Sequence, residues 1–113
     1  MYGAGPMSKP PADLPIRDNP QQGQFEADLG CGALAIAAYS LHDGTIAFTH
    51  TEVPPEHEGK GVGSALIRFS LDAVRARGLK VVPACAFYAA YFKRHPDVQD
   101  LLDPAYRDKL GLA

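Results

Sequence analysis

The sequence predicts a mixed α+β fold in which an antiparallel meander of strands is joined to one βαβ unit. Three observations carry this prediction. Strand-like segments recur over residues 24–53, the dipeptide Asp43-Gly44 separates two of them, and a glycine-rich loop leads into a long helical pattern that begins at Val62. The length of 113 residues suits a single domain with one hydrophobic core.

Three strands are predicted in the first half of the chain, over residues 24–29, 33–41 and 45–53. The first two are separated by Gly30-Cys31-Gly32, which fits either a turn or a bulge. The second and third are separated by Asp43-Gly44, which accepts positive φ at both central positions of a two-residue turn. We therefore expect the second and third strands to form an antiparallel hairpin.

A helix is predicted over residues 62–77, because apolar residues recur there at helical spacing. Arg75 and Arg77 fall in its last turn, where positive charge is favourable. Gly78 follows directly and is a typical helix terminator. This segment is the clearest helix in the sequence.

The chain continues with a short apolar strand over residues 79–84 and a second helix over residues 87–94. Pro96 ends that helix, and residues 98–102 are consistent with one last turn. Strand, loop, helix and strand in this order make a βαβ unit. We therefore expect the 79–84 strand to lie parallel to the 45–53 strand.

The first twenty residues have a different character. They contain five prolines and little apolar material, which predicts a disordered leader over residues 1–20 and a single folded domain over residues 21–113. A true start at Met7, with the preceding residues as a remnant, stays open.

Composition narrows the class of protein. Apolar residues make up 46% of the chain and charged residues 21%, with a formal net charge of -2, so no polyanion-binding signature is present and nucleic acid is not an expected partner. No apolar run approaches the roughly 18 residues of a membrane span, and the N-terminus lacks a signal-peptide layout. We therefore expect a cytoplasmic protein that does not interact with membranes.

The two cysteines agree with a cytoplasmic location, and the four histidines bear on metal binding. Cys31 and Cys85 fit free thiols, although a bond between them stays open. The histidines at positions 42, 50, 57 and 95 have no metal-ligand spacing, so no metal site is predicted.

The segment from Glu58 to Ser64 has the sequence of an anion-binding loop. Gly59, Gly61 and Gly63 allow close approach of the main chain, and the start of the following helix presents unpaired N–H groups. The spacing matches neither a P-loop nor the dinucleotide fingerprint. A merely flexible turn after Pro54-Pro55 is the alternative. Phosphate is the ligand that the loop favours.

Taken together, these motifs resemble the Gcn5-related N-acetyltransferase superfamily and its Gln/Arg-x-x-Gly-x-Gly/Ala signature. The likeness extends to its small, stand-alone Yjdj-type branch through His50-Thr-Glu-Val53, Glu58 to Gly63, Gly78 to Cys85 and Tyr91-Phe-Lys-Arg-His-Pro96. It covers roughly residues 18 to 103. Glu58 stands where the signature usually has Gln or Arg, and Ala86 where the branch often has Pro.

The resemblance implies acetyl-CoA as the cofactor. Its pantetheine arm would lie in a V-shaped gap where the 45–53 and 79–84 strands splay apart, hydrogen-bonded to Val53. Lys60, Lys93 and Arg94 are basic residues available to its phosphates. The pyrophosphate would lie over the main chain of Glu58, Gly59, Lys60, Gly61, Val62, Gly63 and Ser64.

Four side chains are candidates for the chemistry. Cys85 lies where the resemblance places the acetyl end and could accept the acetyl group covalently, although a buried structural thiol explains it as well. His50 and Glu52 share one face of the 45–53 strand and could relay a proton. Tyr91 could protonate the departing sulfur, with Tyr88 as its rival, and either ring could instead fill the core.

The sequence thus favours an acetyl-CoA-dependent N-acetyltransferase that acts on an unidentified amine, by direct attack or through Cys85. A non-catalytic CoA-binding sensor and another kind of nucleotide-phosphate binder are the alternatives. The acceptor, a small molecule or a protein, and the oligomeric state stay open, and a monomer is plausible.

Overall fold

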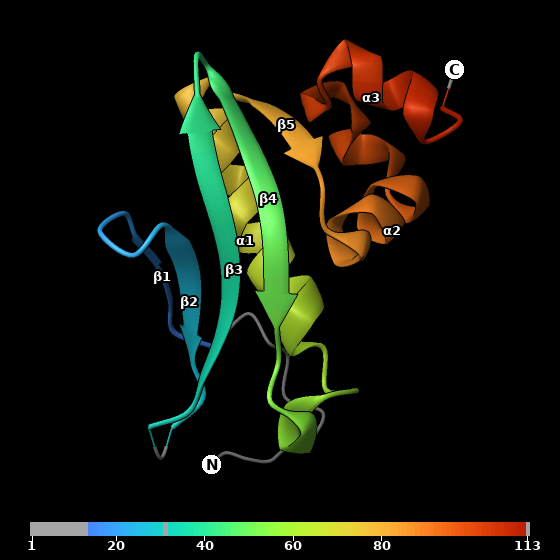
Figure 1. The fold of residues 1–113 in the computed structure, drawn as a ribbon. Coiled ribbons are helices and arrows are strands. Elements are labelled where there is room, and N and C mark those ends of the chain that lie inside the picture. Colours follow the sequence, from blue (N-terminus) through green and yellow to red (C-terminus); the bar gives the residue numbers. More distant parts are fainter. Residues whose placement is uncertain (1–13, 31, 113) are drawn as a thin grey trace.

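The computed structural model describes residues 14–30 and 32–112. Five strands form one sheet in the order β1-β2-β3-β4-β5 (Figure 1). The strands are β1 (Ile16–Asn19), β2 (Gln24–Asp28), β3 (Leu34–His42), β4 (Thr45–Glu52) and β5 (Lys80–Pro83). The helices are α1 (Val62–Arg77), α2 (Ala86–Arg94) and α3 (Pro104–Lys109), with 3-10 turns η2 (Pro55–His57) and η3 (Pro96–Leu101).

The predicted fold class is confirmed. Strands β2, β3 and β4 form the antiparallel meander. Helix α1 connects β4 to β5, and these two strands pair in parallel. The β3–β4 turn has φ values of 49° at Asp43 and 79° at Gly44, as a two-residue hairpin requires. Helix α1 has the predicted bounds and ends at Gly78, whose φ of 70° is left-handed.

Two elements were not predicted. Residues 16–19 were assigned to a disordered leader, which is wrong, because they form the edge strand β1 against β2. Pro15 and Pro20 flank this strand, and an edge position tolerates prolines that a central strand would not.

Helix α3 follows Asp103, whose side chain accepts a hydrogen bond from the amide of Ala105. Residues 1–13 and Cys31 lie outside the described residues.

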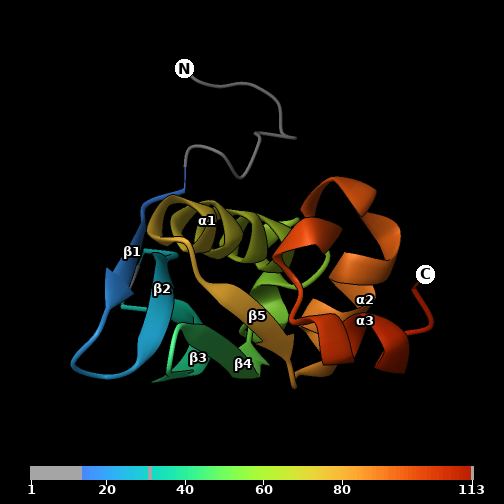
Figure 2. The same cartoon turned by 90° about the horizontal axis from the view of Figure 1, so that it is seen from above.

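Helix α1 lies against one face of the sheet, and the other two helices lie beyond its β5 edge (Figures 1 and 2). Figure 2 shows α1 lying across the sheet and α2 and α3 beside β5. The core fills the space between α1 and the strands, and the rings of Phe48 and Tyr88 stack there with centroids 4.1 Å apart and an interplanar angle of 6°. The other fully buried large side chains include Phe25, Ile46, Leu66, Leu71, Val81 and Phe92.

Strands β4 and β5 separate part-way along their length. They pair only from Thr45 to Phe48 on β4, and the last link is the hydrogen bond of 2.9 Å from the Cys85 amide to the Phe48 carbonyl. Beyond Phe48, β4 continues to Glu52 with β3 as its only strand partner among the described residues. The predicted separation of these two strands is therefore confirmed, with β5 at the edge of the sheet rather than at its centre.

A β-bulge lies where the two strands separate. Ala38 pairs with His50 and Tyr39 pairs with Phe48, so Thr49 has no partner in β3. One extra residue reverses the faces that the following side chains occupy. Ile46 and Phe48 face the helices, and beyond the bulge Thr51 is buried while His50 and Glu52 are exposed.

No helix among the described residues has both the length and the apolar character needed to span a bilayer.

Candidate functional site

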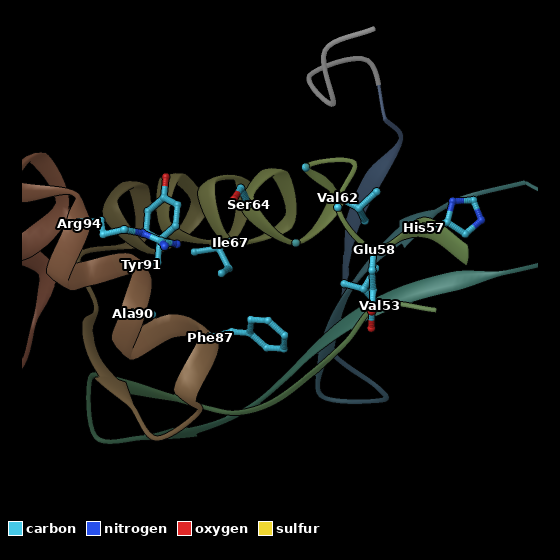
Figure 3. A pocket seen from close by; sticks show the side chains of 13 residues that line it. Val53, His57, Glu58, Val62, Ser64, Ile67, Phe87, Ala90, Tyr91 and Arg94 are labelled. Carbon is cyan, nitrogen blue, oxygen red and sulfur yellow. The ribbon is translucent and has the colours of Figure 1, made fainter. Parts of the chain in front are cut away.

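A groove of about 490 Å³ lies between α1, α2 and the end of β4 (Figure 3). Strand β4 supplies Val53 just beyond its last residue, and helices α1 and α2 supply the two long walls. Its lining residues are Val53, His57, Glu58, Gly59, Gly61, Val62, Gly63, Ser64, Ile67, Phe87, Ala90, Tyr91 and Arg94.

The glycine loop forms one end of the groove. Gly59 and Gly61 both have φ of 81°, a left-handed conformation that side chains rarely adopt. Gly61 caps α1, and its carbonyl accepts the first helical bond from the Ala65 amide at 3.0 Å. The amides of residues 62–64 therefore open the helix without an acceptor inside it. Such a set of N–H groups, with the positive end of a 16-residue helix, fits a phosphate.

Open space adjoins this loop. A β-carbon built on Gly59 would meet no atom within 4 Å, and one on Gly63 would reach only the Val53 side chain, at 3.7 Å. An anionic group can therefore approach the main chain closely at Gly59. The loop residues thus fit the diphosphate of a CoA-type cofactor.

Most of the predicted binding residues meet in this groove. Val53, Tyr91 and Arg94 line it, as do all of residues 58–64 except Lys60. Lys60 is exposed and does not line the groove. Figure 3 shows Arg94 at the opposite end from Glu58, so Arg94 and the glycine loop face different parts of any ligand.

Four lining residues were not predicted from the sequence: His57, Ile67, Phe87 and Ala90. The helical spacing of the sequence could have identified two of them, Phe87 and Ala90. Phe87, Ala90, Tyr91 and Arg94 recur at positions i, i+3, i+4 and i+7, which is one face of a helix. Phe87 is more than half exposed although it is a large apolar residue, as a groove wall without its ligand would be.

The two candidate tyrosines occupy different environments. Tyr88 is fully buried, and its hydroxyl lies 2.7 Å from Ser70 Oγ, which donates to the Ile67 carbonyl. Burial raises the pKa of Tyr88 strongly. Tyr88 is therefore a core residue whose hydroxyl is already hydrogen-bonded to Ser70. Tyr91, one helical turn further on, lines the groove instead.

The Tyr91 ring is held by His95, which follows α2, and by Arg68 of α1. Its ring stacks on that of His95, with centroids 3.8 Å apart, and His95 Nδ1 lies 2.9 Å from the Tyr91 carbonyl. The guanidinium of Arg68, on α1, lies 5.7 Å from the ring centroid and is held by Asp97 of η3 at 2.8 Å. Burial raises the pKa of Tyr91, so its phenol keeps its proton at neutral pH.

Cys85 is not among the residues that line the groove. It is the residue before α2, a free thiol that is 9% exposed. Its Sγ lies 3.3 Å from the Thr51 hydroxyl, which is also buried. Phe87 and Val53, each two residues further along the chain, both line the groove. Thr51 was not among the predicted site residues, because its inward orientation depends on the bulge.

His50 and Glu52 lie together on the opposite face of the sheet. His50 Nε2 is 2.9 Å from Glu52 Oε2, and both side chains are more than half exposed. The expectation that they share a face is confirmed. Strict alternation along residues 45–53 would place Ile46 and Phe48 on this face as well, but the extra residue Thr49 reverses the alternation and puts them on the other face.

Comparison with known proteins gives a family. The model of a family described as GCN5-related N-acetyl-transferase matches residues 24–101, which include the whole groove. The chain belongs to this family. The general activity supported for it is therefore acetyl transfer, while the narrower Yjdj-type assignment stays a prediction.

Individual proteins are similar to this chain at moderate identity. Protein NATD1 of Mus musculus is 34% identical over 95 residues, covering 77% of this chain and 86% of the relative. Protein NATD1 of Xenopus tropicalis is 28% identical over 89 residues, covering 77% and 82%. The solution structure of a GCN5-like N-acetyltransferase candidate from Staphylococcus aureus superposes with a TM-score of 0.64 at 28% identity, covering 80% and 89%.

Proposed function

We propose that this chain is an N-acetyltransferase that uses acetyl-CoA and acetylates an amine on a small molecule or a protein. The observation that carries the proposal is the groove, which has an anion-binding loop at one end and a strand edge free of β5 beside it. The predicted cytoplasmic location remains part of this proposal.

The phosphate end is assigned to main-chain groups. The amides of Val62, Gly63 and Ser64 would donate to the diphosphate, and the positive φ at Gly59 and Gly61 turns the loop toward it. Glu58 also lines this end, and its carboxylate opposes an anion. Binding at this end therefore depends on the main chain rather than on a charged side chain.

The remainder of the groove suits an apolar arm that ends in a thioester. Ile67, Phe87 and Ala90 provide apolar walls, and Val53 lies where β4 has no partner on its β5 side. When bound, acetyl-CoA would supply an activated acetyl group. Tyr91 lies at the end away from the glycine loop in Figure 3, and its protonated phenol would donate to the departing sulfur.

The acceptor amine must lose a proton, and the exposed pair His50 and Glu52 is the candidate to take it. This pair lies on the face of β4 opposite the groove. The proposal therefore requires that the amine reach the acetyl group from the open face of the sheet. Changes at His50 should then lower turnover and leave the affinity for acetyl-CoA unchanged.

Two routes remain within this proposal. In direct transfer the amine attacks the acetyl carbonyl. In the relay, Cys85 Sγ would bond to the acetyl carbon as the bond to the coenzyme sulfur breaks, and that sulfur would take the proton of Cys85 in place of one from Tyr91. The amine would then attack the acetyl carbon, the bond to Cys85 Sγ would break, and the proton lost by the amine would restore the thiol. Cys85→Ala separates the routes: unimpaired turnover would exclude the relay, and loss of an acetylated enzyme in intact mass spectra together with loss of turnover would exclude direct transfer.

Calorimetry with acetyl-CoA tests the binding site. Gly63 is helical, so Gly63→Asp adds a carboxylate to the groove without requiring a left-handed aspartate. We expect at least about a tenfold loss of affinity for Gly63→Asp and a smaller loss for the uncharged control Gly63→Ala. Equal affinity in wild type and Gly63→Asp, or binding of ATP and NAD in preference to acetyl-CoA, would overturn the assignment.

Release of the coenzyme thiol over a panel of amines and peptides tests the activity itself. A non-catalytic acyl-CoA sensor is the second candidate, favoured by Glu58 at the signature position and by the absence of Cys85 from the groove lining. Tight binding of acetyl-CoA with only background release would select the sensor. Amine-dependent release that falls in His50→Ala would select the enzyme.

A further inference from the structure

Three polar or charged side chains are buried in the part of the chain that the structure describes: Glu26, Thr51 and Ser70. Glu26 accepts hydrogen bonds from three side chains, and Ser70 bonds both Tyr88 and the Ile67 carbonyl. Thr51 differs, because the one side-chain partner recorded for it is the sulfur of Cys85, at 3.3 Å. A buried hydroxyl is costly unless it is bonded, and valine would fill the same strand position without that cost.

The bulge at Thr49 is what brings this hydroxyl to the thiol. If the alternation of Ile46 and Phe48 continued without interruption, His50 would face the helices and Thr51 the open side of the sheet. The extra residue exchanges them, and it does so where β4 leaves β5. Bulges re-aim side chains and are frequent beside active sites.

The thiol is held by its main chain as well. The Cys85 amide donates to the Phe48 carbonyl at 2.9 Å, and its own carbonyl accepts from Ala89 at 3.0 Å as α2 begins. The side chain therefore has few ways to move other than rotation about its own Cα–Cβ bond. The Thr51 hydroxyl lies where it limits that rotation.

We propose that Thr51 is a positioning residue, which holds Cys85 Sγ in one orientation and donates a hydrogen bond to the sulfur as negative charge develops on it. The catalytic consequence rests on the proposed function, specifically on the route through Cys85. The contact itself does not, because the reactivity of a thiol can be measured without acetyl-CoA.

Alkylation by iodoacetamide, in a Cys31→Ser background that leaves one thiol, tests the proposal. The sulfur bonds to the methylene carbon, iodide leaves and the thiol proton goes to solvent. Thr51→Val should slow this reaction about fivefold, the effect of one hydrogen bond. Thr51→Ser keeps the hydroxyl and should stay within about twofold of wild type. Thr49→Val, the same change on the exposed side of β4, should have no effect.

A Thr51→Val rate equal to wild type would overturn the proposal. So would equal slowing in Thr51→Val and Thr51→Ser, since packing rather than the hydroxyl would then be responsible. If Thr51→Val does not fold, Thr51→Ala makes the same comparison, and slower alkylation despite its smaller side chain would support the hydroxyl. If Thr51→Val slows alkylation of Cys85 but the protein does not bind acetyl-CoA, the contact between Thr51 and Cys85 is supported and the proposed function is contradicted.

Discussion

The two halves of β4 differ in what surrounds them. From Thr45 to Phe48 the strand is paired on both edges, with β3 and β5, and its buried side chains belong to the core. From Thr49 to Glu52, β3 is its only strand partner among the described residues and the bulge exchanges its faces. This half carries Thr51 and the proton-transfer candidates His50 and Glu52. One strand thus serves as scaffold in its first half and as part of the site in its second.

This difference shows how a small domain can leave part of a strand edge unpaired while the neighbouring part of the same strand is paired and packed in the core. An unpaired edge exposes main-chain donors and acceptors, which are available to a ligand but are not satisfied within the sheet. The fully paired half and the stacked rings of Phe48 and Tyr88 stabilise the strand directly beside that edge. Substitutions test this difference between the paired and open halves of β4, from the largest expected change in the free energy of unfolding to the smallest.

The largest effect is expected in the paired half. Phe48→Ala removes a fully buried ring that stacks on Tyr88 and contacts Phe25, and should lower the free energy of unfolding by about 3 to 5 kcal/mol. Thr49→Ala, at the neighbouring exposed position, should cost about 0.5 kcal/mol or less. Urea unfolding followed by circular dichroism measures both. Similar losses at the two positions would contradict the division at the bulge.

Two tyrosines on α2 make the next test. Tyr88→Phe removes a buried hydroxyl bonded to Ser70 and should destabilise the fold by about 1 kcal/mol. Tyr91→Phe keeps its ring packing against His95, so its main effect should be on turnover rather than on the unfolding midpoint. Thermal unfolding and an acetyl-transfer assay, run on both variants, would show whether the roles are instead reversed.

The buried carboxylate of Glu26 should make the free energy of unfolding depend on pH. Glu26 is 4% exposed, and hydrogen bonds from Gln24, Asn19 and Arg17, the first of them the largest influence, lower its pKa from 4.5. A lowered native pKa stabilises the fold above about pH 4.5, and this stabilisation is lost as the pH falls through the native value. Glu26→Gln should therefore cost about 1 kcal/mol at neutral pH and progressively less below pH 4.5.

Glu52 provides the matched control for that measurement. It lies on the same face, since Glu26 and Glu52 both pair with Ile36, but its side chain is 65% exposed. Glu52→Gln should change the free energy of unfolding at neutral pH by about 0.5 kcal/mol or less, because exposed pairs contribute little to folding. Parallel stability curves for wild type and Glu26→Gln between pH 3 and 7 would show that the buried network does not act as described.

The smallest effect on stability is expected at His50. Its contact with Glu52 is an exposed pair, and such pairs contribute little to folding. His50→Ala should change the free energy of unfolding by about 0.5 kcal/mol or less. A loss comparable to that of Tyr88→Phe would mean that the open half of β4 is also part of the scaffold.

Local sequence was sufficient for the elements whose cause is local. Helix α1 begins and ends as predicted, because its apolar spacing and the terminating Gly78 are written in consecutive residues. The Asp43-Gly44 hairpin and the glycine loop follow in the same way, because few residues other than glycine adopt their positive φ values. Most of the groove could be assigned from the same loop, with Val53 and Tyr91 added by the family resemblance.

Tertiary structure decided what depends on partners distant in sequence. Strand β1 forms because β2 offers it an edge, in spite of its flanking prolines. Alternation within β4 predicted one set of inward side chains, but pairing with β3 leaves Thr49 unmatched and turns Thr51 toward Cys85, 34 residues away. The periodicity of a strand fixes which residues share a face only while its register is unbroken, and register is a property of two strands rather than of one.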